Sequence, residues 1–221
     1  MEKEFWNERW SMGQIGFHLG EVNPHLVRQY DHLPLLPASE ILVPLAGKSL
    51  DLRFFMEAGH HVTAIELSQL AIEAFFEEQG LNPSRRSEGA FVRYETDQMV
   101  FLQGDFFELR PTQIAPPTLV YDRAALVAMP PSMQSRYVSQ LIQLAQGAPL
   151  FLVTLDYPPH EMQGPPFPIP KAQVEALFGS THDIQALDTR DELEHSPPFK
   201  AKGLTRFTES AWLLTPLNQN G

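Results

Sequence analysis

Residues 41–52 read ILVPLAGKSLDL, an apolar run followed by a turn that contains Gly47, Lys48 and Ser49. The tripeptide GKS closes the phosphate-binding loop G-x-x-x-x-G-K-[ST], whose first glycine would stand at position 42. Position 42 is Leu, and Pro44 removes an N–H donor from the turn. The stretch is therefore not a phosphate cradle, and it predicts a buried strand that ends in a tight turn before a helix.

The same order of apolar run and helical segment recurs along the chain. Strands are predicted at 40–45, 61–66, 99–103, 118–122 and 150–155, and helices at 49–58, 68–80 and 132–147. Residues 90–94 are expected to form a hairpin with the third strand, and residues 204–214 to form an antiparallel strand at the sheet edge. This alternation predicts an α/β fold, a mostly parallel sheet with helices on both faces.

Composition narrows the class of protein. The chain has 221 residues, a formal net charge of −11 and no cysteine, which disfavours a nucleic-acid partner and excludes disulfides and thiolate metal sites. We expect one domain over 1–221, with an N-terminal helical cap at 1–38 and an α/β core at 39–221. Without a leader peptide or an apolar run of eighteen residues, we expect no membrane partner, a cytoplasmic location and a monomer.

Several side chains that could bind a ligand follow the predicted strands, at the edge of the sheet where open α/β folds bind ligands. Gly47 lies after the first strand, where a small residue lets the backbone approach a ligand. Glu66 ends the second strand, 19 positions later, and can accept hydrogen bonds from two ribose hydroxyls. Asp105 follows the third strand and can accept from an exocyclic amine, while Phe106 offers an aromatic face; Arg123 ends the fourth.

Together these residues predict an adenosine site without a pyrophosphate cradle, because G-x-G-x-x-G is absent. That combination points away from NAD and towards S-adenosylmethionine. A metal centre is not predicted, since Pro24 and Pro34 interrupt the segment that carries His18, His25 and His32. The acidic run 188–194 is expected to be a solvated surface stretch.

Ordered motifs along nearly the whole chain resemble the thiopurine S-methyltransferase family. They are WNERW (6–10), GFH (16–18), VNP (22–24), LVPLAGKS (42–49), AIELS (64–68), GDFF (104–107), YDRAAL (121–126) and GPPF (164–167). The resemblance implies a class I methyltransferase fold, a Rossmann-like three-layer sandwich whose seven-stranded sheet has an antiparallel last strand. It also implies S-adenosyl-L-methionine as the methyl donor, with no metal.

The resemblance assigns roles to particular residues. Trp10, Leu45, Glu66 and Arg123 would contact S-adenosylmethionine, and Asp105 with Phe106 would lie against the adenine. Phe17 and Arg123 would border the acceptor pocket. Two departures are visible: Ala46 stands where relatives usually have Cys, and residues 197–199 lack an arginine that some relatives place near the acceptor.

The activity expected is transfer of a methyl group to an aromatic or heterocyclic thiol such as a thiopurine, a detoxification reaction. Arg123 would favour the thiolate, and no dedicated general base is predicted. Two alternatives stay open: a methyltransferase for halide, thiocyanate, selenium or tellurium acceptors, and a non-catalytic S-adenosylmethionine-binding protein. In the N-terminal segment, Phe5, Trp6 and Trp10 would form one stripe of a short helix that either packs on the core or closes over a ligand.

Overall fold

The computed structural model describes residues 3–14, 16 and 18–217. In it, alternate side chains of the central strands are buried on opposite faces of one sheet. In β1 (Glu40–Val43), Leu42 packs into one hydrophobic cluster, whereas Ile41 and Val43 pack into a second. A strand that is apolar on both faces requires a layer of helices on each. The continuous apolar run at 41–43 therefore places this strand in the middle of the sandwich.

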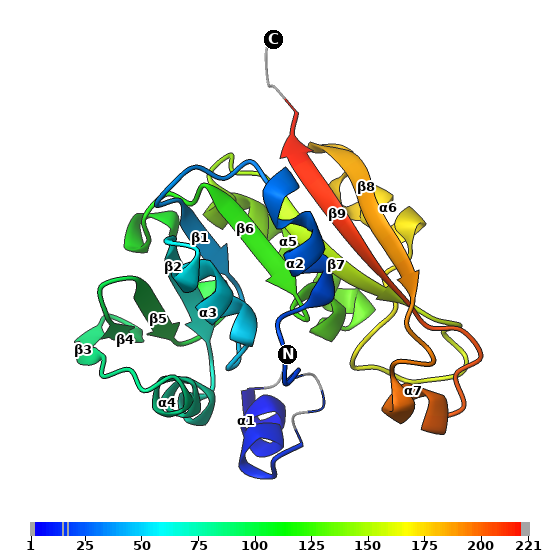
Figure 1. The fold of residues 1–221 in the computed structure, drawn as a ribbon, viewed down its shortest axis with the longest axis horizontal. Helices are drawn as coiled ribbons and strands as arrows, with labels where there is room; N and C mark the ends of the chain where they lie inside the picture. Colours follow the sequence, from blue (N-terminus) through cyan, green and yellow to red (C-terminus); the bar gives the residue numbers. More distant parts are fainter. Residues whose placement is uncertain (1–2, 15, 17, 218–221) are drawn as a thin grey trace.

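Within the described residues, nine strands form a single sheet in the order β3-β4-β5-β2-β1-β6-β7-β9-β8 (Figure 1). After β1 the strands are β2 (His61–Glu66), β3 (Ser84–Glu88), β4 (Phe91–Glu95), β5 (Met99–Gln103), β6 (Leu119–Arg123), β7 (Leu150–Asp156), β8 (His182–Asp191) and β9 (Thr208–Pro216). The strands β5, β2, β1, β6 and β7 are parallel, so their carboxyl ends lie along one edge.

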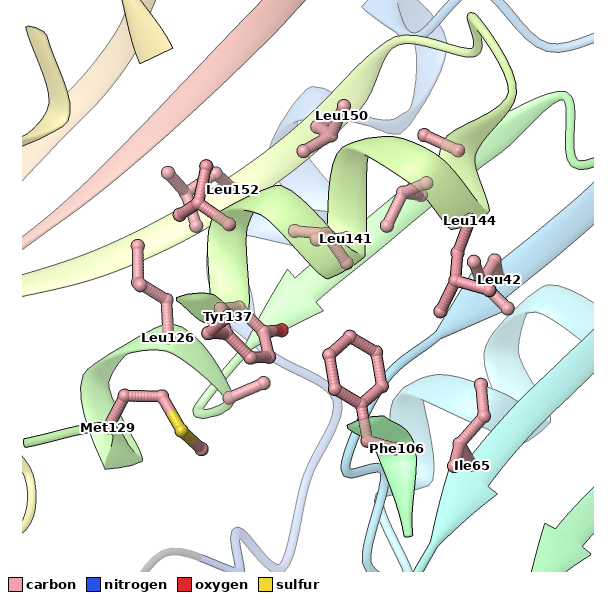
Figure 2. Packing of buried hydrophobic residues seen from close by; sticks show 14 of the residues in the cluster. Leu42, Ile65, Phe106, Leu126, Met129, Tyr137, Leu141, Leu144, Leu150 and Leu152 are labelled. Atoms are coloured by element: carbon pink, nitrogen blue, oxygen red, sulfur yellow. The ribbon is translucent and has the colours of Figure 1, made fainter. Parts of the chain in front are cut away.

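Helices cover both faces of the sheet. The α-helices are α1 (Lys3–Ser11), α2 (Pro24–Gln29), α3 (Leu50–Glu57), α4 (Gln69–Glu78), α5 (Pro131–Ala145), α6 (Lys171–Phe178) and α7 (Pro197–Ala201). The 3₁₀ turns are η1 (Tyr30–His32), η2 (Phe106–Glu108), η3 (Pro111–Gln113) and η4 (Leu126–Ala128). Buried residues of α5 and α6 belong to the cluster that contains Leu42, as Figure 2 shows for Tyr137 and Leu141 of α5. Buried residues of α2, α3 and α4 belong to the opposite cluster.

The predicted α/β architecture is confirmed, but the sheet has nine strands instead of seven. The hairpin of β4 with β5 was predicted, and β3 extends it by pairing antiparallel with β4. The sequence of β3 is SRRSE, and its side chains are exposed or half-buried. Without apolar alternation this strand has no period-2 signal. It pairs with β4 through backbone hydrogen bonds, and Arg86 forms an ion pair with Glu95 of that strand.

The last strand, β9, is antiparallel as predicted, but its predicted place at the sheet edge is wrong. It lies between β7 and β8, and it is antiparallel to both. The edge is formed by β8, most of whose residues are exposed or half-buried, which is typical of an edge strand. Its last residues belong to the acidic run that was expected to be a solvated stretch, and Asp188 there contacts His25 of α2.

Two classes of feature are absent from the part of the chain that the structure describes. It contains no cluster of three or more His, Cys, Asp or Glu side chains able to hold a metal ion. Nor does any helix there have the length and apolarity to cross a bilayer.

Candidate active site

A cavity of about 500 Å³ opens at the carboxyl ends of the parallel strands. Seven residues predicted from the sequence line it: Trp10, Leu45, Gly47, Glu66, Asp105, Phe106 and Arg123. They come from α1, from the loops after β1 and β5, and from the last residues of β2 and β6. The eighth, Phe17, lies outside the described residues. The polar groups are therefore brought together by the parallel arrangement of the strands.

Glu66 is anchored by the backbone. Its Oε2 accepts a hydrogen bond from the N–H of Gly47 at 2.9 Å, and its Oε1 accepts from the N–H of Ser68 at 2.7 Å. Burial raises the pKa of the Glu66 carboxyl, although the N–H groups of Ser68 and Gly47 act in the opposite direction. Each oxygen keeps a further lone pair, so the carboxylate can still accept from a ligand.

The residue that precedes α4 also helps to hold Glu66. Ser68 stands at the N-cap position, yet its side chain makes no capping hydrogen bond within the described residues. Its backbone N–H donates to Glu66 instead. The start of α4 thus fixes the carboxylate that faces the cavity.

The turn after β1 has a backbone that few residues adopt. Leu45 has φ 47° and Gly47 has φ 55°, both in the left-handed region. A Cβ at Gly47 would lie 3.1 Å from Cζ2 of Trp10, so glycine lets the indole of α1 approach the turn closely. Because leucine at positive φ is strained, this geometry is held by the surrounding fold at a functional edge of the sheet.

The Lys48-Ser49 pair has structural roles that agree with the rejection of a phosphate loop. Ser49 caps α3, its hydroxyl accepting from the N–H of Asp51 at 3.2 Å. Lys48 forms an ion pair with Glu78 of α4. The pair therefore joins the turn to the two helices that follow it.

Asp105 and Phe106 leave β5 into η2. The carboxylate of Asp105 accepts from the N–H of Phe107 at 3.0 Å. Phe106 is 4% exposed, and its ring stacks on that of Tyr137 with centroids 5.0 Å apart, as the labelled rings in Figure 2 indicate. Because Phe106 borders both the core and the cavity, its position is fixed by packing.

Asp122 is a core residue, unlike its neighbour Arg123. It is fully buried, its Oδ1 accepts from the N–H of Leu126 at 3.1 Å, and its Oδ2 accepts from the hydroxyl of Tyr137 at 2.7 Å. Burial raises the pKa of Asp122 to about 6, against the effect of those hydrogen bonds. This carboxylate therefore organises the exit of β6 and leaves Arg123 to line the cavity.

Sequence reasoning missed two acidic residues, Asp51 and Glu209, that line the same cavity as Arg123. Asp51 of α3 accepts from the backbone N–H of Asn23 at 2.7 Å and from the hydroxyl of Tyr121 at 3.0 Å. Glu209, at the start of β9, accepts from Nδ2 of Asn23 at 3.4 Å and lines the cavity. The motif VNP at 22–24 was the available signal, since Asn before Pro commonly caps a helix, as Asn23 does for α2.

Part of the cavity wall is apolar, although Glu192, His195 and Lys202 also line the cavity. Pro165 and Pro166 contribute from the GPPF loop, and Phe199 and Phe207 contribute from the α7 region. The two phenylalanine rings stack with centroids 4.3 Å apart. A flat apolar ligand could pack against such a wall.

A sequence profile of the family described as Thiopurine S-methyltransferase (TPMT) matches residues 1–216. The chain belongs to this thiopurine S-methyltransferase family. The Thiopurine S-methyltransferase of Pseudomonas fluorescens (strain SBW25) is 45% identical over 215 residues, 97% of this chain and 99% of the relative. That of Methylococcus capsulatus is 44% identical over 216 residues, 97% of each chain. The resemblance inferred from the motifs is thereby confirmed.

Solved structures show the same fold at low identity. A 1,6-didemethyltoxoflavin-N1-methyltransferase from Burkholderia thailandensis, with bound S-adenosylhomocysteine, has a TM-score of 0.61 at 15% identity, over 96% of this chain and 87% of that chain. A TehB-like SAM-dependent methyltransferase from Corynebacterium glutamicum has a TM-score of 0.56 at 9% identity, over 97% and 98%. The class I methyltransferase fold is confirmed, and family membership makes the chain an S-adenosylmethionine-dependent methyltransferase.

The residues on the cavity wall fit this methyl donor. The carboxylate of Glu66 is held by two backbone donors and retains lone pairs for hydroxyl groups. The absence of a side chain at Gly47 keeps the turn open up to Trp10. The cavity volume of about 500 Å³ lies in the range of small-molecule and cofactor sites.

Proposed function

We propose that the protein methylates the sulfur of an aromatic or heterocyclic thiol, with thiopurines as one class of acceptor. The observation that carries the proposal is that Arg123 lines one cavity together with Glu66 and with the stacked rings of Phe199 and Phe207. A cation supports a thiolate, and the apolar wall supports a flat ring. The relatives that are named Thiopurine S-methyltransferase support the same class of acceptor.

When bound, S-adenosylmethionine supplies a methyl group on a sulfonium sulfur. Glu66 would accept hydrogen bonds from the ribose hydroxyls, while Trp10 and Leu45 would flank the donor and exclude water. Asp105 and Phe106 would face the adenine. These roles are supported by the position of all five residues on the cavity wall.

Arg123 would hold the acceptor with its sulfur ionised, because an adjacent cation lowers the pKa of a thiol. Holding the reacting atoms roughly 3 to 3.5 Å apart can account for about 7–11 kcal/mol of barrier lowering. Residues 1–38 would form a cap over the core at 39–221 within one domain, supported by the contribution of α1 to the cavity wall.

An acceptor panel tests the proposal. Purified protein is incubated with donor labelled in its methyl group and with a thiopurine, a thiophenol, iodide or selenite. Methylated thiopurine and thiophenol are expected in preference to products from the two inorganic acceptors. Turnover of iodide or selenite without turnover of any thiol would exclude the assignment.

A further inference from the structure

A buried histidine lies between two carboxylates beside the cavity, and the proposed function does not use it. His25 of α2 is 0% exposed. Its Nε2 lies 3.5 Å from Oε2 of Glu209, and its Nδ1 lies 3.3 Å from Oδ2 of Asp188. Neither contact meets hydrogen-bond geometry, and both ring nitrogens lack another partner among the described residues. A neutral imidazole in this position can accept a proton on one nitrogen and donate from the other.

The three side chains form a path that leads from the cavity to solvent. Glu209 lines the cavity, His25 is fully buried behind it, and the side chain of Asp188 is 26% exposed. Arg28, 3.4 Å from Asp188, lies at the outer end of the path with 35% exposure. Figure 1 shows α2, which carries His25, in front of the sheet near β9.

The path begins on the acceptor side of the cavity. In the sheet order, β6 with Arg123 lies between β2, which carries Glu66, and β9, which carries Glu209. Donor binding was assigned to Glu66, so Arg123 separates the donor end from Glu209. An acceptor sulfur held by Arg123 would therefore have Glu209 as the carboxylate on its far side.

We propose that Glu209 takes the proton of the acceptor thiol and that His25 and Asp188 pass it to solvent. In this step the S–H bond breaks, the proton goes to a Glu209 oxygen and the electron pair stays on sulfur, giving the thiolate that Arg123 stabilises. The proton then moves to Nε2 of His25, and the proton on Nδ1 leaves through Asp188. This inference depends on the proposed thiol acceptor, and it adds the general base that the sequence did not predict.

The surroundings of both groups suit this exchange. Burial raises the pKa of Glu209, against the effect of Arg123 and Asn23, so its carboxylate can hold a proton closer to neutral pH than an exposed one. Burial lowers the pKa of His25, against the effect of Asp188, which favours the neutral ring. The remaining charged groups that face the pair are Arg28, Asp51, Arg190 and Glu192.

The test is the pH dependence of kcat/KM with two thiophenols. One has a thiol pKa about two units above the lowest assay pH and is ~1% ionised there, and the other is fully ionised throughout. For Glu209→Gln, we expect kcat/KM at pH 6 to fall about 100-fold with the first acceptor, the low end for a general base, and to recover as pH rises to the acceptor's own pKa. With the fully ionised acceptor, the variant should stay close to the wild type.

Two further variants complete the test. Asp188→Asn, on the partly exposed β8, should shift the profile in the same direction by a smaller amount. The control Asp183→Asn removes a negative charge from an exposed position on the same strand that does not line the cavity, and its profile should keep the wild-type shape. An equal loss with both acceptors in Glu209→Gln, or an unchanged profile, would overturn the relay while leaving the proposed function intact. A wild type that methylates no thiol would overturn both.

Discussion

Replacing Glu66 by Gln should weaken donor binding while leaving the fold in place. The carboxylate accepts from the N–H groups of Gly47 and Ser68, one on each oxygen. Glutamine has one oxygen, so one of the two backbone donors would face an amide NH₂ that cannot accept. Any hydrogen bond from a ribose hydroxyl to that side of the group would be lost as well.

The size of the effect follows from the charge that is removed. A hydrogen bond to a charged group contributes about 1.5–3 kcal/mol. At about 1.4 kcal/mol for each factor of ten, the dissociation constant for S-adenosylhomocysteine should rise roughly 10- to 150-fold. The free energy of unfolding should change less, because a neutral amide avoids the cost of burying a charge, the same cost that raises the pKa of Glu66.

Calorimetric titration of wild type, Glu66→Gln and Glu73→Gln measures this difference. Glu73 is exposed on α4, in the next turns after Ser68, and its change to Gln removes the same charge without touching the cavity. In the wild type, affinity should also decline as pH falls through the raised pKa of Glu66, because the protonated carboxyl accepts fewer hydrogen bonds, and Glu66→Gln should lack this dependence. A dissociation constant within twofold of wild type would show that Glu66 does not hold the donor.

Three other substitutions test separate parts of the site. Arg123→Met should lower kcat/KM for a thiol roughly 10- to 150-fold, the loss of one charged contact, and more at pH 6 than at pH 9; equal rates over that range would remove Arg123 from the mechanism. Gly47→Ala should weaken donor binding in calorimetry, since a side chain at positive φ costs about 1–2 kcal/mol and the new methyl would lie 3.1 Å from the Trp10 ring. Unaltered affinity would contradict a close approach of the Trp10 ring to the turn. The pKa of the Asp122 carboxyl is raised from 3.8 to about 6 in the folded protein, so the wild type loses stability as pH rises through this range. Asp122→Asn lacks this loss, and its free energy of unfolding relative to wild type should rise by up to about 3 kcal/mol between pH 4 and pH 7, as measured by urea denaturation. A difference that is independent of pH would refute this expectation.

The central strands, and the place of Glu66 on the cavity wall, could be predicted because their signals are local. Apolar runs predict β1 and β2, and the carboxylate at the end of β2 predicts that Glu66 faces a ligand. Strand direction alone brings residues 47, 66, 105 and 123 to one edge. The two N–H donors that hold Glu66 come from the turn after β1 and from the start of α4, and no sequence pattern gives their geometry. Leu45 is similar: its place on the wall follows from the motif, but its φ of 47° does not.

The part of the cavity wall that contains Glu209 could not be predicted because its contacts join distant parts of the chain. Asn23 and Glu209 are 186 positions apart, and the hydrogen bond between them depends on how α2 packs over β9. The acidic run of β8 looked like a solvated surface, and most of it is exposed, yet one of its residues faces a buried histidine. A single charged residue on an edge strand carries no local signal of such a partner.

Strand direction also explains why Glu209 in particular escaped notice. In a parallel strand, the residues next to a ligand come at the end of the apolar run, and that rule led to Glu66 and Arg123. β9 runs the opposite way, with Leu155 near the end of β7 paired with Glu209 near the start of β9. Its first residues therefore reach the same edge of the sheet as the last residues of its parallel neighbours. For a sheet with an antiparallel strand, side-chain candidates should be sought where that strand begins, and here that position holds a carboxylate that lines the cavity.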